Sequence, residues 1–216
     1  MKVLFYGDSI TDAGRNYELM HGSDSYGNGY VKYVVEELLK KGFTEEDFLN
    51  RGISGNRSVD LYARIKGDCW NHKPDVVSIL VGINDVWPFE FEGNGVELNR
   101  YEKVYRMMIE DTKAKLPNVQ MILCEPFMLV ETAYENDRIK WTSDEGIREY
   151  AAIVKKLAKE YGLPFVALQD KLLQEAAENG TEYYSCDGIH PTPAGAKLIA
   201  NEWLKVFEQE IKNKNY

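Results

Sequence analysis

The sequence has little positive charge, and what it has is spread along the chain. Its 26 lysines and arginines are outnumbered by 35 aspartates and glutamates, which gives a formal net charge of −9. A protein that binds nucleic acid presents a concentrated basic surface to the phosphate backbone. The charge pattern therefore disfavours nucleic acid as a partner.

Long apolar runs are also missing. No segment approaches the roughly 20 apolar residues that a membrane span requires. The short apolar run that follows Lys2 lacks the length and the cleavage site of a secretory signal peptide. We therefore expect a soluble, cytoplasmic protein that does not bind membranes.

Cysteine is scarce. The three cysteines, Cys69, Cys124 and Cys186, are odd in number, widely spaced and without a CxxC pair, which disfavours a disulfide framework or a zinc site. Free cysteine is often a small buried side chain, and we expect that role here. The chemistry inferred below requires no ion, so we expect no metal and no cofactor.

No linker or low-complexity tract interrupts the sequence, so we interpret residues 1–216 as one domain. Short apolar runs alternate with longer amphipathic stretches. The expected strands cover 2–6, 48–50, 76–81, 120–124 and 164–168, and the expected helices cover 29–41, 99–116, 145–161, 171–178 and 194–212. This alternation predicts an α/β fold in which helices cover both faces of a parallel sheet.

Polar motifs follow several of these strands. Ser9 comes directly after the first strand, and Asp187 and His190 lie in the loop before the last helix. Functional groups gather beyond the carboxyl ends of parallel strands, so we expect the motifs to meet at one edge. A serine becomes a nucleophile when a histidine takes its proton and a carboxylate orients that histidine. We interpret the three residues as such a set, with a surface turn capped by Asp187 as the alternative.

Acyl transfer also needs hydrogen-bond donors for the oxyanion that develops. Gly55 follows the second strand and can present an unobstructed backbone N–H, and Asn84 follows the third strand and carries an amide. A glycine-rich turn or an Asx turn would explain each motif separately. The other histidines, His21 and His72, lie in polar connections and are expected to be exposed rather than catalytic.

Four segments, taken in order, resemble the four blocks of the SGNH-hydrolase (GDSL esterase/lipase) family. They are Gly7-Asp8-Ser9-Ile10, Gly55, Gly82-Ile83-Asn84-Asp85 and Asp187-Gly188-Ile189-His190-Pro191, and they span most of the chain. The first block lacks the second glycine of G-x-S-x-G, which excludes the nucleophile elbow of α/β-hydrolases.

The resemblance assigns a role to each residue. It implies that Ser9 is the nucleophile, His190 the base and Asp187 the acid that orients the base. It further implies an oxyanion hole formed by the Ser9 N–H, the Gly55 N–H and the Asn84 side chain. The family fold is a three-layer α/β/α sandwich of flavodoxin-like type, and we expect a central parallel sheet of five strands.

Residues 50–56, 82–87 and 125–127 look similar to the bacterial carbohydrate-esterase branch of this family, which includes acetylxylan esterases. We therefore expect a serine esterase that removes short acyl groups, with acetyl favoured, from a sugar or short oligosaccharide. Aromatic faces suit a pyranose ring, although aromatic residues also fill cores. We expect Trp87, Phe127 and Tyr184, together with Asp8, to contact the substrate.

Other functions stay open. Within the family the alternatives are a lysophospholipase or a thioesterase, although acidic side chains at 90, 92, 131, 135 and 137 disfavour an anionic lipid surface. Outside it, the sheet suits a non-catalytic carbohydrate- or phosphate-binding domain, but the glycine-rich segment 22–29 lacks the ending of a P-loop. The long polar segment 127–145 is expected to border the substrate site. The resemblance also favours a homo-oligomer.

Overall fold

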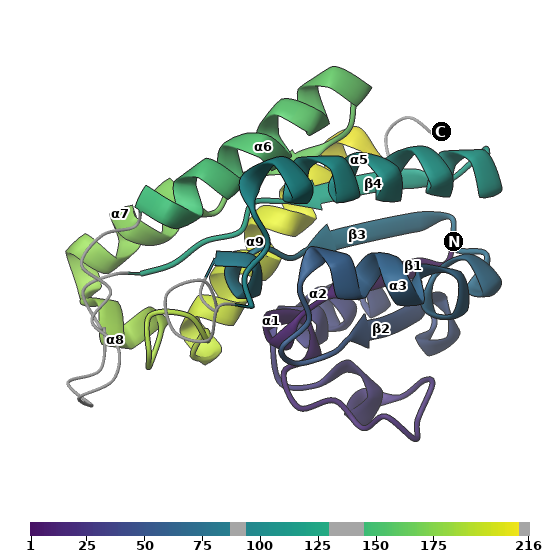
Figure 1. The fold of residues 1–216 in the computed structure, drawn as a ribbon. Helices are drawn as coiled ribbons and strands as arrows, with labels where there is room; N and C mark the ends of the chain where they lie inside the picture. The colour runs from purple at the N-terminus through teal and green to yellow at the C-terminus, as the bar shows by residue number, and fades with distance from the viewer. Residues whose placement is uncertain (87–93, 130–144, 212–216) are drawn as a thin grey trace.

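The computed structural model describes residues 1–86, 94–129 and 145–211. Within them, parallel strands form one sheet in the order β2-β1-β3-β4-β5. The strands are β1 (Val3–Gly7), β2 (Phe48–Gly52), β3 (Val76–Leu80), β4 (Gln120–Cys124) and β5 (Phe165–Val166). This is the flavodoxin-like order of a doubly wound sheet. The predicted fold class is confirmed, and Figure 1 shows the sheet between its helices.

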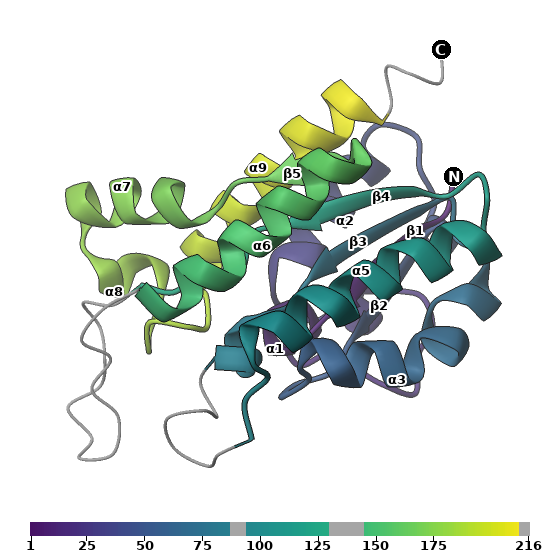
Figure 2. The same ribbon diagram turned by 45° about the horizontal axis from the view of Figure 1, so that its top comes forward.

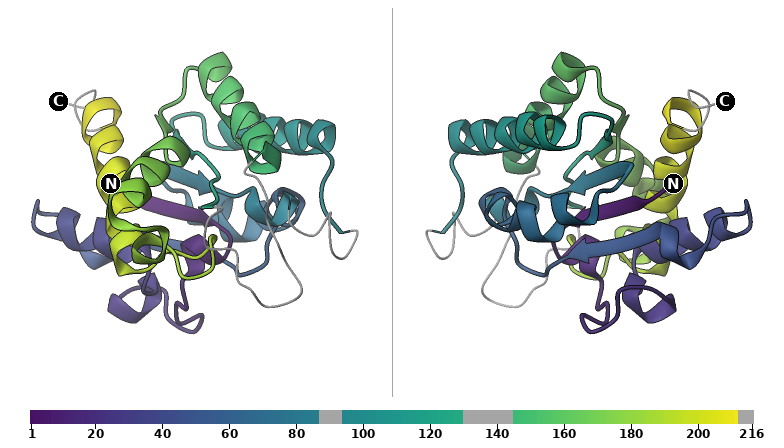
Figure 3. Two further views of the ribbon diagram at one scale, coloured as in Figure 1. Left: turned by 90° about the vertical axis from the view of Figure 1, so that its left-hand side faces the viewer. Right: turned by 90° about the vertical axis from the view of Figure 1, so that its right-hand side faces the viewer.

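Two layers of helices cover the sheet (Figures 2 and 3). On one face α2 (Tyr30–Leu39) packs against α9 (Pro193–Glu210), and on the other α5 (Leu98–Lys115) packs against both α3 (Ser58–Asp68) and α6 (Glu145–Tyr161). Other elements are α1 (Ser9–Asp12), α7 (Gln169–Asn179), α8 (Thr181–Tyr184) and 3-10 turns at Ser23–Tyr26, Glu45–Asp47 and Trp70–His72. No helix in the described ranges is both long and apolar enough to cross a bilayer.

Strand β1 lies between β2 and β3 and packs against both layers, because successive side chains of a strand point to opposite faces. The Phe5 ring contacts Tyr30 of α2 and Trp203 of α9, with centroid distances of 5.9 and 5.2 Å. The neighbouring Tyr6 points the other way and donates its hydroxyl to the Leu61 carbonyl of α3 at 2.6 Å. Both faces of the strand are buried, which explains its continuous apolar sequence.

A polar residue in buried strand β3 has a partner from the helix layer. Ser78 lies level with Phe5 in the sheet and therefore faces α9. There the Trp203 indole N–H donates to Ser78 Oγ at 2.9 Å. A buried indole N–H needs an acceptor, so this serine suits the core and carries no catalytic implication.

Apart from short helical turns such as α1 and α8, the predicted elements agree with the structure except at two places. The five predicted helices are present with ends within two residues of those observed. Helix α3 was not predicted, because its buried residues Ser58, Leu61 and Ile65 form a narrow stripe with little apolar signal. The predicted strand 164–168 is only two residues long, Phe165–Val166, and α7 begins shortly after it at Gln169.

The carboxyl ends of three neighbouring strands form the edge at which the polar motifs meet. Gly7 of β1 lies level with Gly52 of β2 and Leu80 of β3. A Cβ atom on Gly52 would lie 2.3 Å from the backbone nitrogen of Asp12, so this glycine allows α1 to lie directly on the end of β2. In a flavodoxin-like sheet the β1/β3 boundary is the topological switch point where ligands bind. The predicted convergence of the motifs on this edge is therefore confirmed for the segments after these strands.

Candidate active site

Ser9 is the first residue of α1, the single helical turn that follows β1. Asp8 caps this turn, because its carboxylate accepts a hydrogen bond from the backbone N–H of Ile10 at 3.0 Å. The Ser9 side chain is half-buried. The short helix thus fixes the direction of a serine hydroxyl at the carboxyl edge of the sheet.

Ser9, His190 and Asp187 form a continuous chain of hydrogen bonds. Ser9 Oγ lies 2.9 Å from His190 Nε2, and His190 Nδ1 lies 2.6 Å from Asp187 Oδ2. The other oxygen of Asp187 accepts the backbone N–H groups of Ile189 and His190 at 2.9 and 2.6 Å. The Ser185 hydroxyl donates to the His190 carbonyl at 3.0 Å. With the ring proton donated from Nδ1 to the carboxylate, Nε2 is left to accept from the serine.

Asp187 and His190 shift each other's pKa in opposite directions. Burial would raise the pKa of Asp187, but the hydrogen bonds from the His190 ring and from two backbone N–H groups outweigh it and lower the pKa to about 2. The hydrogen bond with Asp187 raises the pKa of His190, against the opposing effect of burial. Asp187 is therefore a carboxylate near neutral pH, and an imidazolium beside it is stabilised.

The other histidines lie at the opposite edge of the sheet. His21 Nδ1 lies 3.3 Å from the carbonyl of Phe48, the first residue of β2, and His72 precedes β3. Both are half-buried rather than exposed as predicted. Among the described residues, His190 is thus the histidine that reaches Ser9.

The Gly55 loop after β2 is held against α1. Ser54 donates both its backbone N–H and its hydroxyl to Asp12 Oδ2, at 3.0 and 2.7 Å. Gly55 adopts a φ of 79°, a conformation that favours glycine, and the space where a side chain would stand is open. The backbone of Gly55 is therefore accessible and fixed to the helix that carries Ser9.

Asn84 is tied to the same loop. It lies in a helical segment after β3, over residues 83–86, and is 7% exposed. Its Nδ2 donates to the backbone carbonyl of Asn56 at 3.0 Å. The adjacent Asp85 carboxylate accepts the backbone N–H of Ser58 at 3.0 Å. Burial raises the pKa of Asp85 to about 7, against the opposing effect of the hydrogen bonds from the side chain and backbone of Ser58. The loop after β2 and the segment after β3 thus position each other.

Three of the four predicted substrate contacts have little exposed surface in the structure. Asp8 is 1% exposed, and its carboxylate caps α1 instead of facing the solvent. Phe127 is also 1% exposed and belongs to the core. Tyr184 is 8% exposed, with its hydroxyl between Glu175 and Asn179. Its neighbour Tyr183 is 59% exposed. Trp87 and residues 130–144 of the segment 127–145 lie outside the described residues.

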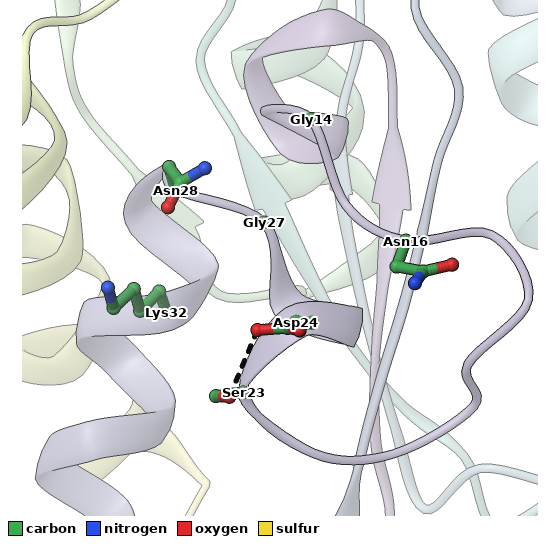
Figure 4. Close-up of a pocket in the computed structure, with 7 residues that line it drawn as sticks. All are labelled: Gly14, Asn16, Ser23, Asp24, Gly27, Asn28 and Lys32. Atoms are coloured by element: carbon green, nitrogen blue, oxygen red, sulfur yellow. Dashed lines mark hydrogen bonds between the residues drawn. The ribbon is translucent and has the colours of Figure 1, made fainter.

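A polar hollow of about 340 Å³ lies beside α1 (Figure 4). Its lining includes Gly14, which follows α1, Asn28, which precedes α2, and Lys32 in the first turn of α2. None of Ser9, Asp187 and His190 lines it. This hollow is therefore not the space in which an ester would meet the serine.

The family model of the GDSL-like lipase/acylhydrolase family matches residues 5–198. The chain belongs to this family. An acetylxylan esterase of Geobacillus stearothermophilus is 37% identical to it over 212 residues, which cover 94% of this chain and 92% of the relative. The isoamyl acetate-hydrolyzing esterase of Saccharomyces cerevisiae is 27% identical over 96% of this chain and 86% of its own length. The protein is thus a carboxylic-ester hydrolase.

Solved structures of the family have the same fold. The crystal structure of the Geobacillus acetylxylan esterase Axe2 matches with a TM-score of 0.80 and 36% identity, covering 97% of this chain and 94% of that one. A candidate GDSL-like lipase of Parabacteroides merdae matches with a TM-score of 0.87 and 37% identity, over 95% and 94% of the two chains. The family resemblance predicted from the sequence motifs is confirmed.

Several residues that support the site were not predicted. Asp12 and Asn56 hold the loop that carries Gly55, and Ser185 holds the main chain at His190. Asp12 stands three residues after Ser9, just beyond the first motif, a helical spacing that offered a local signal. Ser185 has no such signal, because its partner is a backbone carbonyl.

The role of base that the sequence predicts for His190 implies that the rate of ester hydrolysis falls at acid pH, as this side chain becomes protonated. Asp187 raises the pKa of His190, so the acid limb of kcat/KM should have its midpoint above the ordinary histidine value of about 6.5. Below that midpoint kcat/KM should fall about tenfold per pH unit, because only neutral imidazole accepts the serine proton. A profile of p-nitrophenyl acetate hydrolysis measures this limb.

Asp8 provides the control for this profile. Burial raises its pKa to about 7, so it titrates in the same range, and its negative charge raises the pKa of His190. Asp8→Asn should move the acid limb to lower pH without abolishing it. Loss of the limb in this variant would assign the titration to Asp8 and contradict the role of His190.

Proposed function

We propose that this protein is a serine esterase that hydrolyses short-chain acyl esters of carbohydrates, acetyl esters above all. The observation that carries the proposal is the chain of hydrogen bonds from Ser9 through His190 to Asp187, with distances of 2.9 and 2.6 Å. Crystal structures of Axe2 include catalytic mutants in which a serine in one and an aspartate in another are replaced by alanine. The residue types agree with those of this chain.

In the proposed reaction, Ser9 Oγ attacks the ester carbonyl while His190 Nε2 takes the hydroxyl proton. The imidazolium is stabilised by ionised Asp187 and then gives its proton to the leaving alcohol oxygen as the C–O bond breaks. The acyl group is left on Ser9. Water, deprotonated by His190, attacks this acyl-enzyme, releases the carboxylic acid and restores the serine.

The oxyanion would be bound at the edge that joins α1 to the segments after β2 and β3. We assign its donors to the backbone N–H groups of Ser9 and Gly55 and to Asn84 Nδ2. An amide nitrogen carries two hydrogens, so the bond from Asn84 to the Asn56 carbonyl fixes the amide and leaves the second hydrogen for substrate. The left-handed backbone of Gly55 and its open surroundings favour access to its N–H.

The choice of substrate rests on the relatives. The two curated relatives are named for esters of acetic acid, and the more similar of them acts on acetylated xylan. The exposed ring of Tyr183, six residues before Ile189 in the chain, offers an aromatic face near the loop of the proposed base. We propose an acetylated sugar or short oligosaccharide as the substrate.

A panel of esters tests this function. We expect kcat/KM for p-nitrophenyl esters to fall at least about tenfold from acetate to hexanoate, because a pocket that fits a methyl group rejects added methylenes. We also expect acetate release from acetylated xylosides, with the Ser9→Ala variant as the blank. A preference for long acyl chains without activity on sugar acetates would contradict the carbohydrate assignment and favour a lipase or thioesterase.

A further inference from the structure

Arg64 of α3 makes more contacts than an ion pair requires. Its guanidinium donates to Asn56 Oδ1 at 2.7 Å, to the Arg51 carbonyl and Asp68 Oδ2 at 2.9 Å each, and to the Gly7 carbonyl at 3.2 Å. Its side chain is only 17% exposed. Three of the four acceptors are uncharged, so the contacts do more than neutralise one carboxylate.

These contacts lie where the site is built. Gly7 ends β1, the strand that leads into Ser9, and Arg51 is the second-last residue of β2. The guanidinium also lies over the Tyr6 ring, with Cζ 4.5 Å from the centroid. Tyr6 is fully buried and bonded to α3 through its hydroxyl. The stacking fixes the plane of the guanidinium, and the rigid fork then fixes the directions of its bonds.

The contact with Asn56 links Arg64 to the proposed oxyanion hole. Asn56 follows Gly55, and its backbone carbonyl accepts the hydrogen bond of the Asn84 amide at 3.0 Å. Asp12 holds the other side of Gly55 through Ser54. Gly55 thus lies between two anchored residues, one held by an acid of α1 and the other by an arginine of α3.

We propose that Arg64 is a positioning residue for the oxyanion hole, because it holds Asn56 and thereby sets the place of the Asn84 amide. The proposal rests on the proposed esterase function, which supplies the roles of Gly55 and Asn84. Arg64 itself touches no reacting atom. A donor that is displaced by about 1 Å loses much of its effect on the transition state.

The ion pair with Asp68 does not by itself explain why residue 64 is an arginine. Asp68 also binds Arg51, so it has a second cationic partner when Arg64 is replaced. A helical i,i+4 ion pair needs one charged contact, and a lysine at position 64 would still provide it. A lysine ammonium has no planar fork, however, and cannot bind the four acceptors at the same time.

Arg64→Lys therefore separates positioning from ion pairing. We expect kcat for p-nitrophenyl acetate to fall by about 10- to 100-fold. KM should stay within about twofold of the wild-type value, since the donor that Arg64 positions acts in the transition state. Assays well below the thermal unfolding midpoint keep a loss of stability out of the rate. An unchanged kcat would overturn the proposal, whatever the effect on stability.

Arg106→Lys is the matched control. Arg106 likewise pairs with carboxylates, Glu102 and Glu160, lies over a tyrosine ring and is 28% exposed. Its partner Tyr161 precedes β5, at the amino edge of the sheet and away from Ser9. This variant should keep kcat within about twofold, as expected for a surface contact remote from the chemistry. An equal loss of kcat in both variants would show a general effect and contradict positioning.

Asn56 tests the same contact from the other side. Asn56→Asp keeps an acceptor for Arg64 and should retain most of the wild-type kcat, whereas Asn56→Leu should lose as much as Arg64→Lys. In an Asn84→Ala background, Arg64→Lys should reduce kcat by no more than about threefold further, because the group it positions is gone. Fully additive losses would overturn the proposal. Failure of the proposed function would be distinct, since Ser9→Ala would then retain the wild-type rate.

Discussion

Replacing Ser9 by alanine should reduce kcat for acetate esters by about 10⁶-fold, the order found when the nucleophile of a catalytic triad is removed. Ser9 Oγ is the atom within 2.9 Å of His190 Nε2, and alanine leaves the base without a proton to take. KM should change little, because binding does not depend on the hydroxyl. Initial rates with p-nitrophenyl acetate at high enzyme concentration measure the residual activity.

The fold of the Ser9→Ala variant should be unchanged, because Ser9 is half-buried and alanine is a good helix former. Ser23→Ala, at an exposed position of a 3-10 turn, should retain the full rate. A fluorophosphonate probe should label the wild type and Ser23→Ala and leave Ser9→Ala unlabelled. Wild-type turnover by Ser9→Ala would show that another group is the nucleophile, and an unlabelled wild type would favour a binding protein.

The strength of the local signal decides how much of the fold the sequence predicts. Strands such as β3 are continuous apolar runs because both faces are covered, and α9 begins at a proline that favours a helix start. Helix α3 has no comparable signal, since only three of its residues are buried. Tertiary contacts stabilise it, among them Tyr6 with the Leu61 carbonyl and Ser58 with Asp85.

The distinction between local sequence signals and tertiary contacts also applies to the residues of the site. The structure brings Ser9, Asp187 and His190 together, and short motifs predicted all three because each follows a strand or precedes a helix. No motif predicts which aromatic side chains are accessible to a substrate, because exposure depends on tertiary packing: Tyr183 is exposed and Tyr184 beside it is buried. Arg64 has no sequence signature either, since two of its acceptors are backbone carbonyls of distant strands.

Replacing Asp187 by asparagine should lower kcat by about 10⁴-fold, as in triads where this change reverses the histidine tautomer. An asparagine amide facing His190 Nδ1 would donate to it, which places the ring proton on Nε2 and removes the acceptor from the Ser9 hydroxyl. Asparagine keeps an oxygen for the backbone N–H groups of Ile189 and His190, which Asp187 Oδ1 now accepts. The loop should therefore stay folded while the base is lost.

The pH profile of Asp187→Asn distinguishes this explanation from a simple loss of structure. The hydrogen bond with Asp187 raises the pKa of His190, so the acid limb of the residual activity should move to lower pH in the variant. Asp170→Asn, which removes an exposed carboxylate paired with Arg148, should change neither the rate nor the limb. A variant that loses activity with an unmoved limb would show that Asp187 does not act through His190. A shifted limb together with an unchanged thermal midpoint of unfolding would mean that the carboxylate sets both the tautomer and the charge of the base. The pKa of Asp187 is about 2, so the carboxylate would then keep the triad in its active form throughout the neutral range.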